Sequence, residues 1–174
     1  MACFYFDSTA QKEQSAATVL GALLKQVVGS FDQIPDEIMD AYRRHKKLIG
    51  GRELLLPEIV KMLGSLSSTR RTFLCLDALD ECGVPDRAKV LLSLNEIIEM
   101  SGTTRVFLTG RPYVGDEVGN NFSKGTTLVS ISPRTEDIIL YIHTKLAEDT
   151  NSGEIDERLK AGIVEKIPET VPEM

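Results

Sequence analysis

The sequence is poor in features that mark several specialised classes of protein. None of its apolar runs approaches the length of a membrane span, and its amino terminus lacks the basic and then apolar layout of a secretion signal. Basic residues are outnumbered, with 20 Lys and Arg against 26 Asp and Glu. This balance argues against nucleic-acid binding, because such proteins present a concentrated basic face. We therefore expect neither a membrane nor a nucleic acid as a partner.

Cysteine is also scarce, with three residues in 174 and no Cys-x-x-Cys spacing. Cys3 and Cys75 fall in apolar stretches, where a free cysteine behaves as a small hydrophobic residue. This usage favours a reducing compartment, and hence a cytoplasmic location. Cys82 follows a cluster of acids and could be a reactive thiol. Neighbouring carboxylates raise the pKa of a thiol, however, and favour an unreactive one.

In the first half of the chain, apolar residues at helical spacing predict three consecutive helices. The first runs from about Gln14 to Val28, the second opens at Pro35, and the third has Pro57 in its first turn. Their apolar stripes could receive a partner, but core packing is favoured because three such helices must bury their stripes. The basic run at 43–47 is expected at the end of the second helix, where cations offset the helix dipole. A nucleic-acid or lipid patch is the alternative.

The chain is organised around residues 72–82, an apolar run that ends abruptly in three carboxylates. Its first residues suit a strand buried on both faces, with Asp77 at the carboxyl end. Ligands bind at this edge of open α/β sheets, because the chain turns there and leaves a crevice. Asp77, Asp80 and Glu81 repel one another unless a cation or a proton is shared among them. The sequence thus predicts a site for a hard divalent ion, with Mg²⁺ the leading candidate.

A second strand is expected close to these acids. Residues 84–102 read as a helix, and Arg105–Thr109 read as a strand directly after it. A strand, a helix and a strand of this length form a unit whose strand ends share one edge of the sheet. Arg111 is therefore expected on the same edge as the three acids, within reach of one ligand.

Further elements are predicted at both ends of the chain. Ala2–Phe6 is aromatic and apolar and reads as a buried strand. Near the other end, Thr126–Ile131 alternates enough to be a last strand, and a helix follows Pro133. A final helix is expected from about Glu154 to Lys166, with fraying after Pro168.

Phe73–Glu81 resembles the Walker B segment of P-loop nucleoside triphosphatases in its NACHT form, a hydrophobic run followed by Asp, a small residue, Leu, Asp and Glu. Thr104–Pro112 resembles that family's next core strand and its sensor arginine. With the opening Ala2–Ser8, these segments look like the middle of a NACHT domain, of the STAND class, from a fungal NLR-like or ankyrin-repeat protein. The resemblance covers nearly the whole chain.

The resemblance implies an α/β fold with a three-layer, P-loop NTPase-like parallel sheet. It implies Asp77 as the acid on the Mg²⁺ side, and Asp80 or Glu81 as the residue that orients an attacking water. Arg111 would be the sensor, and ATP or GTP the nucleotide. A simpler alternative for Arg111 is an ion pair with Asp80 or Glu81. The two roles are compatible if the arginine exchanges partners.

The family's Walker A loop, Gly-x-x-x-x-Gly-Lys followed by Ser or Thr, does not occur in the sequence. This loop and its lysine hold the nucleotide phosphates. We therefore interpret residues 1–150 as a partial NACHT core whose amino-terminal P-loop strand is missing, and 151–174 as the start of a frayed helical region. The resemblance implies that the missing strand lies between the Asp77 and Arg111 strands. These two then either close up or expose unpaired edges.

Two functions follow from this interpretation. The first is a nucleotide-dependent signalling switch whose catalysis is lost and whose own nucleotide binding is weak or absent. The second is a non-catalytic module that self-associates or binds a full-length NACHT protein through its incomplete sheet. A metal-dependent phosphohydrolase that uses Asp77 and Asp80 directly is a third reading, although the usual spacing of its acids is absent.

Overall fold

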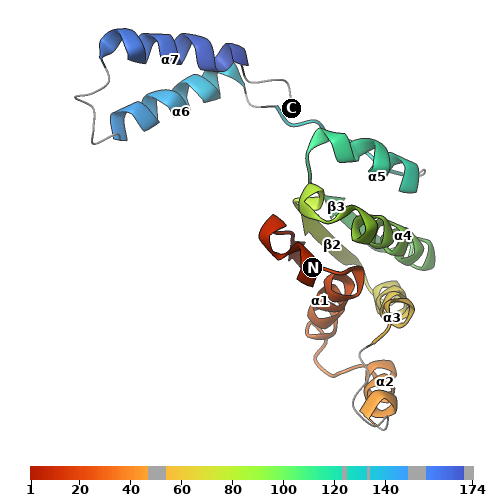
Figure 1. Cartoon of the computed structure of the whole chain (residues 1–174). Coiled ribbons are helices and arrows are strands. Elements are labelled where there is room, and N and C mark those ends of the chain that lie inside the picture. The colour runs from red at the N-terminus through yellow and green to blue at the C-terminus, as the bar shows by residue number, and fades with distance from the viewer. Residues whose placement is uncertain (47–53, 123–124, 133, 149–155, 171–174) are drawn as a thin grey trace. The chain divides into compact units, whose positions relative to one another are not determined.

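The structure is a computed structural model that describes residues 1–46, 54–122, 125–132, 134–148 and 156–170. It divides into two compact units, Met1–Thr126 and Thr127–Met174, and each is considered by itself (Figure 1). None of the described helices combines the length and the apolar character that crossing a membrane requires. The first unit holds the sheet and every candidate site residue.

An open parallel sheet of three strands forms the centre of the first unit. In order across the sheet, its strands are β1 (Ala2–Tyr5), β2 (Thr72–Asp77) and β3 (Thr104–Leu108). Leu74 in β2 lies opposite Ala2 on one side and Val106 on the other. The predicted α/β class and these three strands are confirmed. The two strands expected to flank a missing one pair directly, so no gap separates them.

The helices predicted from apolar spacing are found close to their expected bounds. They are α1 (Ala16–Val28), α2 (Asp36–Lys46), α3 (Leu56–Ser68) and α4 (Val84–Met100). Ser15 begins α1, because its hydroxyl accepts a hydrogen bond from the Thr18 amide. Pro57 lies in the first turn of α3, where a missing N–H is tolerated. Arg43 and Arg44 lie in the last turn of α2 as predicted, and position 47 is outside the described residues.

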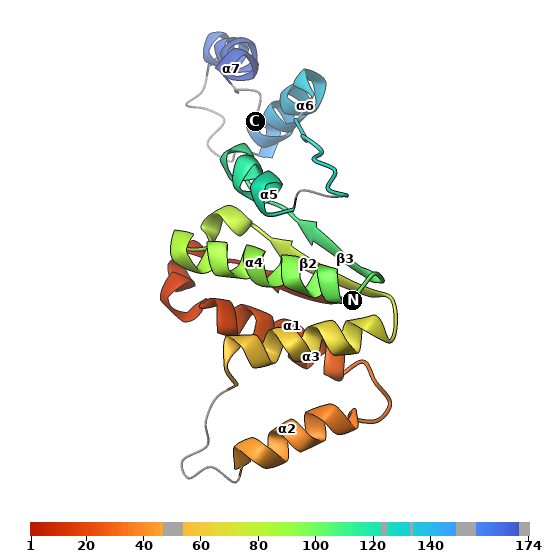
Figure 2. The same ribbon diagram turned by 90° about the vertical axis from the view of Figure 1, so that its right-hand side faces the viewer.

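The hydrophobic core lies between one face of the sheet and three helices. Helices α1, α3 and α4 contact one another, and Figure 2 shows them side by side. Leu74 and Leu76 of β2 are almost completely buried, together with Leu20, Leu63 and Leu91 of the three helices. Removal of this apolar surface from water is the main force that holds the unit together.

The opposite face of the sheet is open. Side chains alternate along a strand, and Tyr5 and Phe107 on this face are 71% and 58% exposed. Phe73 and Phe107 have their ring centroids 6.3 Å apart. The open face, defined as Cys3, Tyr5, Phe73, Cys75 and Phe107, therefore presents thiols and aromatic rings together.

Residues 126–131 do not form the strand that their alternation predicts. Leu128, Val129 and Ile131 are exposed, and the sheet found in the described part of the chain is built from β1, β2 and β3. A strand is stable only when a neighbouring strand and a buried face support it. The alternation of apolar and polar residues was therefore not enough to predict a strand here.

Shorter helices complete the first unit, namely η1 (Ser8–Glu13), η2 (Leu79–Glu81), η3 (Pro112–Val114) and α5 (Gly115–Asn121). In the second unit, α6 (Thr135–Glu148) contacts α7 (Glu157–Thr170). Helix α7 extends to Thr170, two residues past Pro168, and residues 171–174 of the segment expected to fray lie outside the described residues. The proline removes one backbone hydrogen bond near the helix end without stopping the helix. The predicted domain boundary near residue 150 stays a prediction.

Candidate functional site

The carboxyl ends of the three strands meet at one edge of the sheet, as the sequence predicts. Beyond β1, the Phe6 amide donates to the Asp77 carbonyl at 3.0 Å. Beyond β3, the Thr109 carbonyl accepts from the Leu79 amide at 2.9 Å. These two bonds hold the acidic turn, residues 77–82, between the ends of the neighbouring strands.

Asp77 ends β2 with an exposed side chain at this edge. Its Oδ1 accepts a hydrogen bond from the Thr109 hydroxyl, and that hydroxyl accepts one from the Ala78 amide at 3.0 Å. Ala78 has φ 56° and ψ 47°, a left-handed conformation that costs an L-residue about 1–2 kcal/mol. Strain of this kind persists only where the surrounding contacts enforce it. The left-handed residue turns the chain sharply out of the strand direction just before the other two acids.

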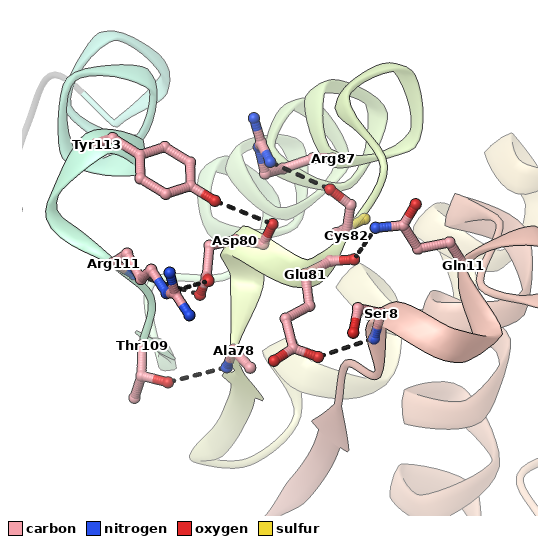
Figure 3. A network of polar contacts seen from close by, with 10 residues as sticks. All are labelled: Ser8, Gln11, Ala78, Asp80, Glu81, Cys82, Arg87, Thr109, Arg111 and Tyr113. Carbon is pink, nitrogen blue, oxygen red and sulfur yellow. Dashed lines mark hydrogen bonds and ion pairs between the residues drawn. The ribbon is translucent and has the colours of Figure 1, made fainter.

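Asp80 is held by the segment that follows β3. Its Oδ1 accepts from the Arg111 amide and its Oδ2 pairs with Arg111 Nε, both at 3.3 Å. The Tyr113 hydroxyl donates to the Asp80 carbonyl at 3.3 Å (Figure 3). A Cβ at Gly110 would lie 3.0 Å from Val114 Cγ2 and 3.4 Å from Asp80 Oδ1, so glycine leaves room for this approach. The Arg111 side chain is 75% exposed whereas that of Asp80 is only 10% exposed, so the guanidinium lies in water and the carboxylate is largely buried.

Glu81 points the other way, toward the end of β1 (Figure 3). Its Oε2 accepts from the Ser8 amide at 2.8 Å, and its carbonyl accepts from Gln11 Nε2 at 2.9 Å. Both partners belong to η1, which begins after Asp7. The hydroxyl and the amide of Thr9 donate to the Asp7 carboxylate and hold its pKa below the usual value. The acidic turn is thus bonded to the segments after both neighbouring strands.

Arg87 of α4 fixes the far end of the acidic turn. Its Nη1 donates to the Cys82 carbonyl at 3.1 Å, and its Nε pairs with Glu117 Oε2 at 2.7 Å. The Arg87 side chain is only 9% exposed. Burial, and then the charge of Asp86, raise the pKa of Cys82 to about 11. The raised pKa expected at Cys82 is found, with burial as a larger cause than the carboxylates.

The model of the family described as nephrocystin 3, N-terminal, matches residues 1–111, more than half of the chain. The chain belongs to this family. The matched span runs from β1 to Arg111 and so contains the whole sheet and the acidic turn. No curated protein and no solved structure gives a significant match. The nephrocystin 3 N-terminal family is distinct from NACHT itself, so the resemblance to NACHT stays a proposal.

The three acids of this nephrocystin 3 N-terminal chain do not converge on one point. Asp77 is bonded to Thr109, Asp80 to Arg111, and Glu81 to η1. Across the residues that the structure describes, no three His, Cys, Asp or Glu side chains are grouped to hold a metal ion. Each acid has a donor of its own in the structure, and the expectation that a cation or a proton is shared among them stays a prediction.

This arrangement does not fit Mg²⁺ bound by protein groups alone, because the acidic turn offers too few converging oxygens. Mg²⁺ is commonly held by one or two carboxylates together with substrate phosphates. Asp77, which is exposed at the end of β2, fits that more limited role. Arg111 lies on the predicted edge, and its pairing with Asp80 is the simpler of the two roles foreseen for it.

Several residues of the site were missed from the sequence. Thr109 is the last residue of a predicted strand, and the same reasoning that selected Asp77 could have found it. Ser8 and Gln11 contact Glu81 across about 70 residues of chain, and no local pattern marks such a contact. Arg87 is equally unmarked, because a charged residue near the start of a helix is ordinarily exposed.

Proposed function

We propose that this chain is the Walker B and sensor part of a NACHT-type, nucleotide-dependent signalling switch of the cytoplasm. In this proposal the intact protein has a three-layer, P-loop NTPase-like fold. The supporting observation is the junction at the sheet edge, where Arg111 after β3 pairs with Asp80 after β2. Glu81 extends the junction to Ser8 after β1. In α/β proteins this edge is where ligands bind, so a ligand here would act on all three strand ends.

Asp77 and Arg111 are the residues that would contact Mg²⁺–ATP or Mg²⁺–GTP. When bound, the ion would neutralise phosphate charge, and Asp77 would hold it from the protein side. Arg111 has an exposed side chain, and phosphate oxygens are strong partners for a guanidinium. It would leave Asp80 for a phosphate oxygen, and the junction between β2 and β3 would loosen. This exchange of partners is the proposed switch.

Turnover is not part of the proposal. Phosphoryl transfer depends above all on positioning of the phosphates, and the sequence contains no Gly-x-x-x-x-Gly-Lys followed by Ser or Thr. In an active relative, Asp80 or Glu81 would orient the attacking water. Here the two carboxylates are bonded to Arg111 and Ser8. We therefore expect nucleotide affinity in the millimolar range, about 4 kcal/mol of binding free energy, without hydrolysis.

Titration of the isotope-labelled chain with Mg²⁺–ATP, followed by NMR, tests the proposal. Amide signals of Ala78, Asp80 and Arg111 should shift and saturate in the millimolar range. The shifts should shrink without Mg²⁺ and in Asp77→Asn, and should persist in the control Glu148→Gln, an exposed change of equal charge on α6. Absence of shifts at the strand ends, or equal shifts in Asp77→Asn, contradicts the proposal.

A second candidate function is a non-catalytic module that binds another copy of itself or a full-length NACHT protein. The open face favours it, because contiguous exposed aromatic surface is typical of interaction sites. Sedimentation of the wild-type chain and of Phe107→Ser tests this function. Concentration-dependent association that is lost in the variant supports it. A clean monomer throughout, without binding to a NACHT protein, counts against it.

A further inference from the structure

Two thiols lie side by side on the open face. Cys3 of β1 and Cys75 of β2 are register partners, so their side chains project from neighbouring strands toward the same side. Both cysteines are free and partly accessible. Burial, and then the charge and hydrogen bond of Cys3, raise the pKa of the Cys75 thiol. The register therefore makes the two thiols neighbours on the open face.

The backbone of Cys3 is held rigidly from outside the sheet. Gln26 of α1 accepts from the Cys3 amide at 2.9 Å and donates to the Cys3 carbonyl at 2.7 Å. The side-chain amide thus takes the place of a neighbouring strand on the outer edge of β1. On its other side Cys3 is fixed by the ladder to β2. A pair of ligands on such a frame is preorganised, which favours tight binding.

The distance between the strands admits a bridge between the two thiols. Adjacent strands lie about 4.8 Å apart, and two metal–sulfur bonds of about 2.3 Å, the length known for zinc thiolates, set two sulfur atoms about 4.6 Å apart when they lie in line. A disulfide is the alternative, because the same strand spacing lies within the Cα separations of about 4.4–6.8 Å at which disulfides occur. A disulfide needs an oxidant to form, whereas a bridging ion does not.

We propose that Cys3 and Cys75 form a two-coordinate site for a soft monovalent cation, Cu(I). Thiolates are the ligands that select Cu(I). Zinc needs four ligands in a structural site, and in the described part of the chain no group of three or more His, Cys, Asp or Glu side chains is placed to supply them. Binding forms two S–Cu bonds and releases both thiol protons to solvent, so copper keeps its oxidation state and no oxidant is required.

The surroundings of the pair are suited to a soft ion. Phe107 is the register partner of Cys75 on β3, so an aromatic residue lies next to the site on the open face. Apolar neighbours limit the access of water and of competing hard ligands. Cys82 belongs to the acidic turn, where its thiol is buried and lies near the Gly83 carbonyl. The site is thus independent of the nucleotide proposal, and the two can fail separately.

Anaerobic titration of the reduced chain with Cu(I), against a competing chromogenic chelator, tests the site. The wild type should take up one equivalent of Cu(I) more tightly than either single variant. Cys3→Ser and Cys75→Ser should each weaken binding by at least about 100-fold, because each leaves a single thiolate. The matched control Cys82→Ser should retain the wild-type affinity. Circular dichroism of each variant establishes that it is folded.

A second measurement needs no variant. Iodoacetamide labelling of the wild type, read out by peptide mass spectrometry, should show that one equivalent of Cu(I) protects Cys3 and Cys75 together. Wild-type affinity in either single variant overturns the proposal. So does labelling of both thiols at an unchanged rate. A Cys3–Cys75 disulfide formed on mild oxidation by a chain that takes up no copper also overturns it, in favour of a redox pair.

Discussion

The two arginines that contact the acidic turn differ in their own burial. Arg87 pairs with Glu117 at 2.7 Å, also binds the Cys82 carbonyl, and has a side chain only 9% exposed. Arg111 pairs with Asp80 at 3.3 Å, and here the arginine side chain is 75% exposed whereas that of Asp80 is 10% exposed. Removing the partner of a buried guanidinium leaves that charge away from water and is costly. A guanidinium in solvent gains less from its partner, because water and salt screen it, so it exchanges more readily for another partner.

This difference separates a fixed end of the turn from a free one. Arg87 joins α4 and α5 to the end of the turn at Cys82. Movement of the turn at this end would break contacts of a buried guanidinium and would therefore cost free energy. Arg111 joins the end of β3 to Asp80 through a guanidinium that lies in solvent. A ligand that binds at the strand ends can therefore displace the Arg111 pair at small cost and leave the Arg87 pair intact. For this reason the proposed switch is assigned to Arg111.

The largest predicted effect follows from removing one partner of the buried pair. Glu117→Ala leaves the Arg87 guanidinium buried without a counter-charge and should lower the free energy of unfolding by about 3 kcal/mol. Urea denaturation measures the change. The neighbouring variant Asp116→Ala removes an exposed acid from the same helix turn and should change stability by about 0.5 kcal/mol or less. Equal losses of unfolding free energy in the two variants would show that the Arg87–Glu117 pair contributes no more to stability than an exposed acid does.

The thiol beside Arg87 should be correspondingly inert. A pKa of about 11 for Cys82 makes its thiolate about 300-fold scarcer at neutral pH than that of an ordinary cysteine, whose pKa is about 8.5. Its alkylation by iodoacetamide should therefore be slow and should rise about tenfold with each pH unit until near its pKa. Peptide mapping compares it with Cys3 in the same molecule. Labelling of Cys82 at neutral pH as fast as that of Cys3 contradicts this environment.

Removal of the exposed arginine should have a much smaller effect on stability. Arg111→Ala should lower the free energy of unfolding by less than about 1 kcal/mol, because the lost guanidinium lies in solvent and the Asp80 carboxylate keeps the amide of residue 111 as a donor. Lys89→Ala is the control, since Lys89 is also an exposed cation and its partner Asp86 is more exposed than Asp80. A loss above about 2 kcal/mol for Arg111→Ala would mean that this arginine is structural, and the proposed exchange of partners would be abandoned.

Salt should produce the smallest effect and should distinguish the two pairs. Raising ionic strength from about 0.1 M to about 1 M shortens the screening length from about 10 Å to about 3 Å. The stability difference between wild type and Arg111→Ala should then vanish, whereas that for Glu117→Ala should persist. Urea denaturation of wild type and of both variants at the two salt concentrations measures this. Salt should reduce the stability loss of Arg111→Ala and should leave that of Glu117→Ala.

The sequence predicted the elements whose local signals are strong and agree with the final packing. Strand β2 is marked by an apolar run that ends in Asp77, and α3 by Pro57 with an apolar stripe behind it. The edge shared by Asp77 and Arg111 followed from the strand, helix and strand order alone. Residues 126–131 show the limit of this reasoning. Their alternation was present, but a strand also needs a neighbour that a local pattern cannot supply.

The site was predictable in position but not in detail. The acids and Arg111 were placed at the correct edge, yet their directions depend on the left-handed Ala78 and on partners far along the chain. Ser8 and Gln11 attract Glu81 toward β1, whereas Arg111 and Tyr113 hold Asp80 toward β3. Repulsion between neighbouring acids suggested a shared ion. Tertiary contacts give each acid a donor of its own, and no sequence pattern reports such contacts.

Calorimetric titration of the chain with ATP, with and without Mg²⁺, tests the central claim most directly. The claim is that the strand ends retain the Asp77 and Arg111 side of a nucleotide site while the sequence lacks the loop that holds phosphates. It predicts Mg²⁺-dependent binding in the millimolar range, weakened in both Asp77→Asn and Arg111→Ala. Micromolar affinity would mean that another segment holds the phosphates. Binding that is indifferent to Mg²⁺ and to both substitutions would contradict a nucleotide site at this edge.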